Sequence, residues 1–89
     1  MNIRWSDEKN SILKSTRNVS FEDVENAIIN DALIDIIPHH NQEQYSHQEL
    51  MIVWIHHYTY YVPFVMNEEE IFLKNIIPSR KYHKKYGKE

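Results

Sequence analysis

The residues with the clearest chemistry lie together at the C-terminal end of the chain. Residues 74–89 hold six basic residues and one acidic residue, whereas residues 1–73 hold four basic and twelve acidic residues. The first segment therefore has a net charge of +5 and the second a net charge of −8. Basic side chains bind phosphate oxygens, and aromatic rings stack on bases. The mixture of lysine, arginine, histidine and tyrosine in this segment indicates a polyanionic ligand and favours RNA.

Individual side chains of this segment suit separate chemical tasks. Arg80 carries a permanently charged guanidinium that can grip a phosphate with two donors. His83 is the residue best suited to exchange a proton near neutral pH, although an exposed histidine without a role fits equally well. The neighbouring residues that suit contacts to phosphates and bases are Lys81, Lys84, Lys85, Tyr82 and Tyr86. A solvated tail, packing on a sheet, or binding of an acidic protein would use the same residues.

Length and composition limit the class of protein. The chain has 89 residues, which is enough for one small domain spanning residues 1–89. It contains no cysteine, so disulfides and thiolate metal sites are excluded. Because no N-terminal apolar stretch resembles a signal peptide and no apolar run approaches ~20 residues, we expect a cytoplasmic protein without a membrane segment.

The first third of the chain predicts two helices. A serine N-cap precedes a helix over about 7–17, with acidic residues in its first turn. Ser20 and Asp23 form a candidate capping box at the start of a second helix, which should end near Asn30 or Asp31.

The remainder predicts an antiparallel sheet followed by a basic tail. The expected strands are 33–37, 50–55, 58–65 and 71–77. His56 and His57 occupy the position of a tight turn between the second and third strands. Pro63 cannot donate a ladder hydrogen bond, so its strand should lie at an edge or contain a bulge. Two helices, about four strands and a tail from Ser79 with helical spacing predict an α+β fold.

Three strings occur in an order that is familiar from a known family. They are Ile3-Arg-Trp-Ser-Asp-Glu-Lys-Asn10, Asn18-Val-Ser-Phe-Glu-Asp-Val24 and Ile76-Ile-Pro-Ser-Arg-Lys81. They span the chain from Ile3 to Lys81 in the right order, and they resemble the BrnT family of bacterial type II toxins. The resemblance implies a RelE-like fold with two N-terminal helices packed on an antiparallel sheet. It also implies an endoribonuclease that cleaves messenger RNA without a metal or other cofactor and so inhibits translation.

The resemblance also implies partners and site residues. A cognate antitoxin, usually of the ribbon-helix-helix type, would neutralise the toxin, and operator DNA would be bound only through that antitoxin. The messenger RNA would be cleaved either free or on the ribosome. Arg80 and Lys81 match the family's Arg-Lys pair and are expected to be catalytic together with His83. The family often has Lys-His-Gly where this chain has Thr16-Arg17-Asn18, so Lys14 and Arg17 would supply the RNA-binding charge there.

Two alternatives follow from other residues. The histidines that could suggest a metal site match no zinc template in their spacing, so we expect loop and turn residues instead. They are His39, His40, His47, His56 and His57. Since the Lys-His pair of the family is missing, a non-catalytic protein of the same fold that binds nucleic acid or an antitoxin is the alternative function.

Overall fold

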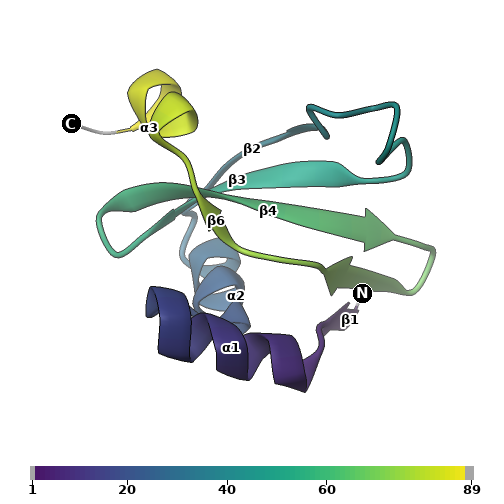
Figure 1. The fold of residues 1–89 in the computed structure, drawn as a ribbon, viewed down its shortest axis with the longest axis horizontal. Helices are drawn as coiled ribbons and strands as arrows, with labels where there is room; N and C mark the ends of the chain where they lie inside the picture. The colour runs from purple at the N-terminus through teal and green to yellow at the C-terminus, as the bar shows by residue number, and fades with distance from the viewer. Residues whose placement is uncertain (1, 88–89) are drawn as a thin grey trace.

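The chain folds into an α+β domain with a single mixed sheet, as Figure 1 shows. This computed structural model describes residues 2–87, so Lys88 and Glu89 of the basic segment lie outside the described residues. In chain order the elements are β1 (Asn2–Arg4), α1 (Asp7–Arg17), α2 (Phe21–Ile29), β2 (Leu33–Pro38), β3 (Glu49–Ile55), β4 (Tyr58–Met66), β5 (Glu70–Leu73), β6 (Ile77–Pro78) and α3 (Arg80–Tyr86). The predicted α+β class is confirmed.

Local side-chain signals place α1 and α2 close to where the sequence predicts them. The Ser6 hydroxyl accepts a hydrogen bond from the Lys9 amide at the start of α1. Asn18 ends this helix in the left-handed conformation, with a φ of 56°. At the start of α2, the Asp23 amide donates to the Ser20 hydroxyl and the Ser20 amide donates to the Asp23 carboxylate. The predicted capping box is therefore confirmed.

The sheet differs from the predicted antiparallel arrangement in two ways. Its strand order is β1-β5-β4-β3-β2, with β6 also paired to β4, and β1 runs parallel to β5. The N-terminal segment, for which no strand was predicted, is thus a strand of the sheet. The predicted strand over 71–77 is divided into β5 and β6. Part of the reason is that Arg17 donates a hydrogen bond of 2.6 Å to the Ile76 carbonyl, which a continuous ladder would otherwise use.

Pro63 lies in the middle of the sheet, so of the two predicted placements, an edge strand or a bulge, the edge strand is wrong. It pairs with Leu50 of β3 without a register shift, and on the other side its carbonyl accepts a hydrogen bond from the Lys74 amide. On that side β4 pairs with β5 at residues 64–66 and with β6 at residues 60–61. The proline nitrogen therefore falls at the break between two partner strands, where no ladder hydrogen bond is lost.

The turn between β3 and β4 is formed by His56 and His57, as predicted. Their φ values are 52° and 63°, and two consecutive positive φ angles are typical of the tight hairpin turns that match strand twist. The His56 ring also lies 3.3 Å from the Asp23 carboxylate. Turn geometry thus accounts for this pair of histidines.

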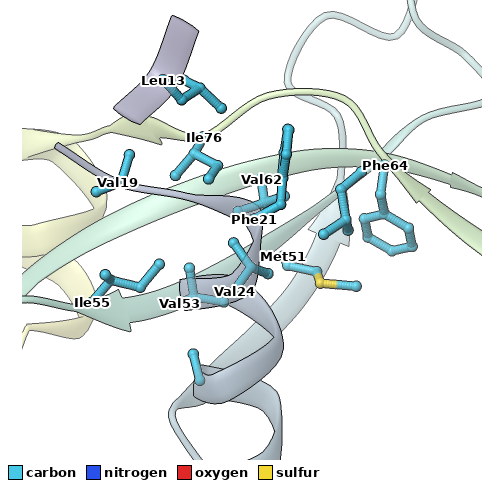
Figure 2. Close-up of a cluster of buried hydrophobic side chains, with 12 residues drawn as sticks. Leu13, Val19, Phe21, Val24, Met51, Val53, Ile55, Val62, Phe64 and Ile76 are labelled. Atoms are coloured by element: carbon cyan, nitrogen blue, oxygen red, sulfur yellow. The ribbon is translucent and has the colours of Figure 1, made fainter. Parts of the chain in front are cut away.

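The main core lies between the sheet and the two N-terminal helices, and Figure 2 shows its side chains. Phe21 and Val24 of α2 are fully buried there against β3 and β4. Strand β3 reads as a continuous apolar run because both of its faces are covered. Met51, Val53 and Ile55 belong to this core, whereas Leu50 and Ile52 belong to a second cluster on the other face.

Helix α3 covers that second face, on the opposite side of the sheet from α1 and α2 (Figure 1). Tyr82 packs with Leu50 and Ile52 in the second cluster. The Tyr86 hydroxyl donates a hydrogen bond of 2.9 Å to Asp35 of β2. The described part of the basic segment is therefore docked on the sheet rather than extended into solvent.

Candidate nucleic-acid interface

Helix α3 separates its residues into a buried aromatic side and an exposed cationic side. Its exposed residues are Arg80, Lys81, Lys84 and Lys85. Positions three and four residues apart share one face of a helix, so the four cations lie together. Within residues 2–87, none of the ion pairs involves any of them. The helix therefore presents positive charge available to an external anion.

Arg80 stands on a well-anchored part of the backbone. It is the first residue of α3 and follows β6 by a single residue, Ser79. The Ser79 amide donates a hydrogen bond of 3.1 Å to the Thr59 carbonyl of β4, and its hydroxyl accepts one of 3.1 Å from the Tyr82 amide. The backbone beneath the guanidinium is thereby fixed while the side chain stays exposed, which suits a group that must meet a phosphate in a defined position.

His83 lies in an aromatic slot. Its ring stacks on Tyr58 at a centroid separation of 4.3 Å and on Trp54 at 5.6 Å. Its Nδ1 atom is hydrogen-bonded at 3.0 Å to the hydroxyl of Thr59, which is fully buried. The ring is thus oriented and partly buried, unlike an exposed tail histidine. Because Nδ1 is occupied, a proton exchanged with a ligand would pass through Nε2.

The two tyrosines predicted to contact bases have packing roles in this structure. Tyr82 is only 6% exposed, and its ring packs edge-on against Tyr61 at 5.7 Å. Tyr86 is partly buried and is held by Asp35. Both residues attach α3 to the sheet, and Tyr82, at 6% exposed, leaves little of its ring for a base to stack on. Contact of the partly buried Tyr86 with a base stays a prediction.

Lys14 and Arg17, also predicted to bind RNA, belong to α1, which packs on the other side of the sheet from α3. The Lys14 ammonium is 3.9 Å from the Glu22 carboxylate. Arg17 donates hydrogen bonds to the Ile76 carbonyl and, at 3.3 Å, to the Asn75 side chain. Arg17 thus braces the segment between β5 and β6, and the structure does not bring Lys14 onto the cationic side of α3.

The pKa of the Glu22 carboxyl beside Lys14 is lowered. The main cause is a hydrogen bond of 2.8 Å donated by the Asn10 side chain, and the Lys14 charge adds to it. The same Asn10 side chain accepts a hydrogen bond from the Phe21 amide, so it ties α1 to the start of α2. These contacts give Glu22 and its neighbours a structural role.

A cleft that the sequence did not predict opens on the α3 side of the sheet. Its volume is about 340 Å³, and the residues that line it include His39, His40, Tyr45, Tyr61, Lys74 and Asn75. They come from the loop after β2, from β4 and from the segment between β5 and β6. We name it the histidine-loop cleft. Burial and then the nearby Tyr82 raise the pKa of the Tyr61 hydroxyl above its ordinary value of 10.0, while the charge of Arg17 acts in the opposite direction.

His39 is the buried member of the loop. It is 7% exposed, its ring lies 4.5 Å from the Tyr45 ring, and its Nδ1 atom accepts a hydrogen bond of 3.0 Å from the Asn41 amide. Burial, followed by the charge of neighbouring His40, lowers the pKa of the His39 imidazole below its ordinary value of 6.5. The neutral ring therefore holds the turn at the start of the loop.

This arrangement predicts that acid destabilises the protein through His39. A lowered pKa means that the unfolded chain binds more protons, so the stabilisation is complete above pH 6.5 and is lost as the pH falls below it. A protonated Nδ1 also cannot accept from Asn41, and a lost hydrogen bond is worth about 1 kcal/mol. In His39→Asn, whose side-chain oxygen keeps an acceptor that does not titrate, we expect a smaller loss.

Urea denaturation of both proteins at about pH 7.5 and about pH 5 measures this difference. An equal acid-induced loss of unfolding free energy in the wild type and in His39→Asn would contradict the assignment. His47→Ala is the control, because this loop histidine is exposed.

Within residues 2–87, no three or more histidine, cysteine, aspartate or glutamate side chains are grouped so that they could hold a metal ion. Across the same residues, no helix combines the length and apolar character needed to cross a bilayer.

Comparison of the chain with protein-family models, with curated proteins and with solved structures gave no match.

Proposed function

We propose that this protein is the toxin of a type II toxin-antitoxin system, a metal-independent endoribonuclease that cleaves messenger RNA in the cytoplasm. The observation that carries the proposal is helix α3, which combines an exposed cationic side with an oriented histidine. Arg80 and Lys81 at its start are also the residues that match the terminal string of the BrnT resemblance.

The arrangement of elements supports a RelE-like fold for this proposal. Two helices and the sheet share one core, and a short basic helix lies on the opposite face. Asn18 ends α1 with a φ of 56°, at the position where the resembled pattern has glycine. Both residue types tolerate the left-handed conformation, so the departure in sequence preserves the local backbone requirement.

The proposed mechanism uses the exposed groups of α3. The 2′-hydroxyl of the RNA attacks the adjacent phosphorus, and negative charge builds up on the phosphorane before the 5′-oxygen leaves. Arg80 and Lys81 stabilise that charge, and Lys84 and Lys85 hold neighbouring phosphates. Nε2 of His83 exchanges a proton with the attacking or the leaving oxygen, since its other nitrogen is held by Thr59.

The same surface suits neutralisation by an antitoxin. An acidic segment of a ribbon-helix-helix antitoxin would pair with the cations of α3 and cover Arg80. Binding to operator DNA would then occur only through the antitoxin. The cleaved messenger RNA would be either free or bound in the ribosome.

One observation favours the non-catalytic alternative. Arg17, which lies within the stretch where the resembled family has Lys-His-Gly, donates its hydrogen bonds to the protein itself. A protein of this fold that only binds nucleic acid or an antitoxin would still need the cationic side of α3. It would show salt-sensitive binding without cleavage.

Primer extension on a reporter messenger RNA after a short induction pulse tests the proposal. We expect new 5′ ends that appear within the pulse and are absent when the uninduced culture is analysed. A soluble, folded protein that binds RNA and produces no new ends would contradict the ribonuclease and establish the alternative.

A further inference from the structure

Aromatic rings form a continuous row from α3 to the loop over residues 39–48. Tyr82 contacts Tyr61 at a centroid separation of 5.7 Å, and Tyr61 contacts His40 at 5.4 Å. The row continues from His40 to His39 at 4.6 Å and from His39 to Tyr45 at 4.5 Å. The histidine-loop cleft lies along this row and reaches Ile77, three residues before Arg80. It therefore adjoins the start of the cationic helix.

The lining of the cleft combines the groups that bind a nucleotide. Its rings include His40, which is exposed, and Tyr61, whose edge-on contact with His40 has an interplanar angle of 81°. Two rings at this angle form a corner against which a flat base can lie. The side-chain amides of Gln48 and Asn75 offer donors and acceptors to the edge of a base.

The charge of the cleft suits a phosphate. Lys74 lines the cleft and is exposed, and its ammonium lies over the Phe72 ring, which is outside the cleft lining, at 5.2 Å from the ring centroid. No carboxylate is among the described residues that line the cleft. Its volume of about 340 Å³ lies at the lower end of the range of about 300–1,000 Å³ that is usual for small-ligand pockets. One nucleotide is a fitting occupant.

We propose that the histidine-loop cleft binds one nucleotide of single-stranded RNA, with its base against His40 and Tyr61 and a phosphate at Lys74. The assignment rests on the proposed function in one respect: the bound nucleotide is a neighbour of the phosphate at Arg80. The amides of Gln48 and Asn75 read the edge of the base, so the cleft sets the sequence preference of cleavage.

Titration of the ¹⁵N-labelled full-length protein with each of the four ribonucleoside 5′-monophosphates tests the site directly. Inorganic phosphate and adenosine are titrated separately as the two halves of the ligand. We expect amide shifts concentrated at residues 39–48 and 74–77, and tighter binding of at least one monophosphate than of either half. Shifts confined to α3, or identical shifts with inorganic phosphate alone, would overturn the proposal.

Matched variants give the same test at the level of single side chains. Because a base stacked on an aromatic ring contributes substantially to affinity, His40→Ala should weaken binding about 5-fold or more. Lys74→Gln should weaken binding of the monophosphate but not of adenosine. The controls are His47→Ala, an exposed histidine of the same loop, and Lys9→Gln, a lysine of α1 on the other face of the sheet. Equal weakening in a control and in its partner variant would contradict the site.

Cleavage mapping separates the failure of this site from the failure of the ribonuclease. If the wild type cleaves, His40→Ala should redistribute the cleavage positions while total cleavage persists, and an unchanged distribution would overturn the specificity role. Nucleotide binding at the cleft without cleavage would contradict the ribonuclease and retain the site. Cleavage of RNA without nucleotide binding at the cleft would support the proposed ribonuclease activity and contradict the proposed nucleotide site.

Discussion

Replacing Arg80 by alanine is expected to lower the rate of RNA cleavage by about 10²–10³-fold, the usual effect of removing one group that stabilises transition-state charge. The guanidinium is exposed and its backbone is anchored through Ser79 to Thr59, so its removal should leave the fold and its unfolding free energy nearly unchanged. The measurement is the cleavage rate of a reporter RNA by purified Arg80→Ala and wild-type protein.

Two further variants show what kind of contact Arg80 makes. Arg80→Lys keeps the positive charge but loses the two-donor fork, so we expect it to recover only part of the rate. Lys84→Ala removes a cation from the same exposed side of α3, so we expect weaker RNA binding with a shallower dependence on salt and little change in the cleavage rate of bound substrate. Full activity in Arg80→Ala would show that the catalytic cation lies elsewhere.

Replacing Tyr82 by alanine is expected to lower the unfolding free energy by about 3 kcal/mol, the lower end of the usual loss for a large buried aromatic side chain. Tyr82 is 6% exposed and is the buried residue of α3 that packs with Leu50 and Ile52. Truncation of the Tyr82 side chain should release α3 from the sheet. Arg80 and His83 would then no longer be held in position. Urea denaturation gives the stability, and hydrogen exchange of α3 amides gives the local release.

Tyr86→Phe is the matched control for Tyr82→Ala. It retains the ring and removes only the hydroxyl that donates to Asp35, so we expect a loss of about 1 kcal/mol. If Tyr82→Ala left both the stability and the exchange of α3 amides at their wild-type values, the docking of this helix would not depend on the second cluster.

Several features were predictable because they depend on neighbours in the chain. The N-cap of α1, the capping box at Ser20 and Asp23, and the hairpin turn at His56 and His57 each involve residues within four positions of one another. Hydrogen bonds and φ preferences at such short range do not depend on the rest of the fold. The apolar run of β3 was likewise recognisable as a strand.

Other features could not be read from the sequence because their partners are distant. The parallel pairing of β1 with β5 joins Asn2 to Glu70, which lie 68 positions apart in the chain. The break between β5 and β6 involves Arg17 of α1. The slot around His83 requires Trp54, Tyr58 and Thr59 from the hairpin of β3 and β4.

The amino-acid sequence by itself determined the α+β class, the helix boundaries and the concentration of positive charge near Arg80. Only the tertiary structure decided which of those basic and aromatic residues face solvent and which support the sheet. The reason is that α3 has seven residues and gains its place from packing. The sheet beneath it turns Tyr82 and Tyr86 inward, leaves Arg80 exposed, and joins the histidine loop to distant strands in one cleft.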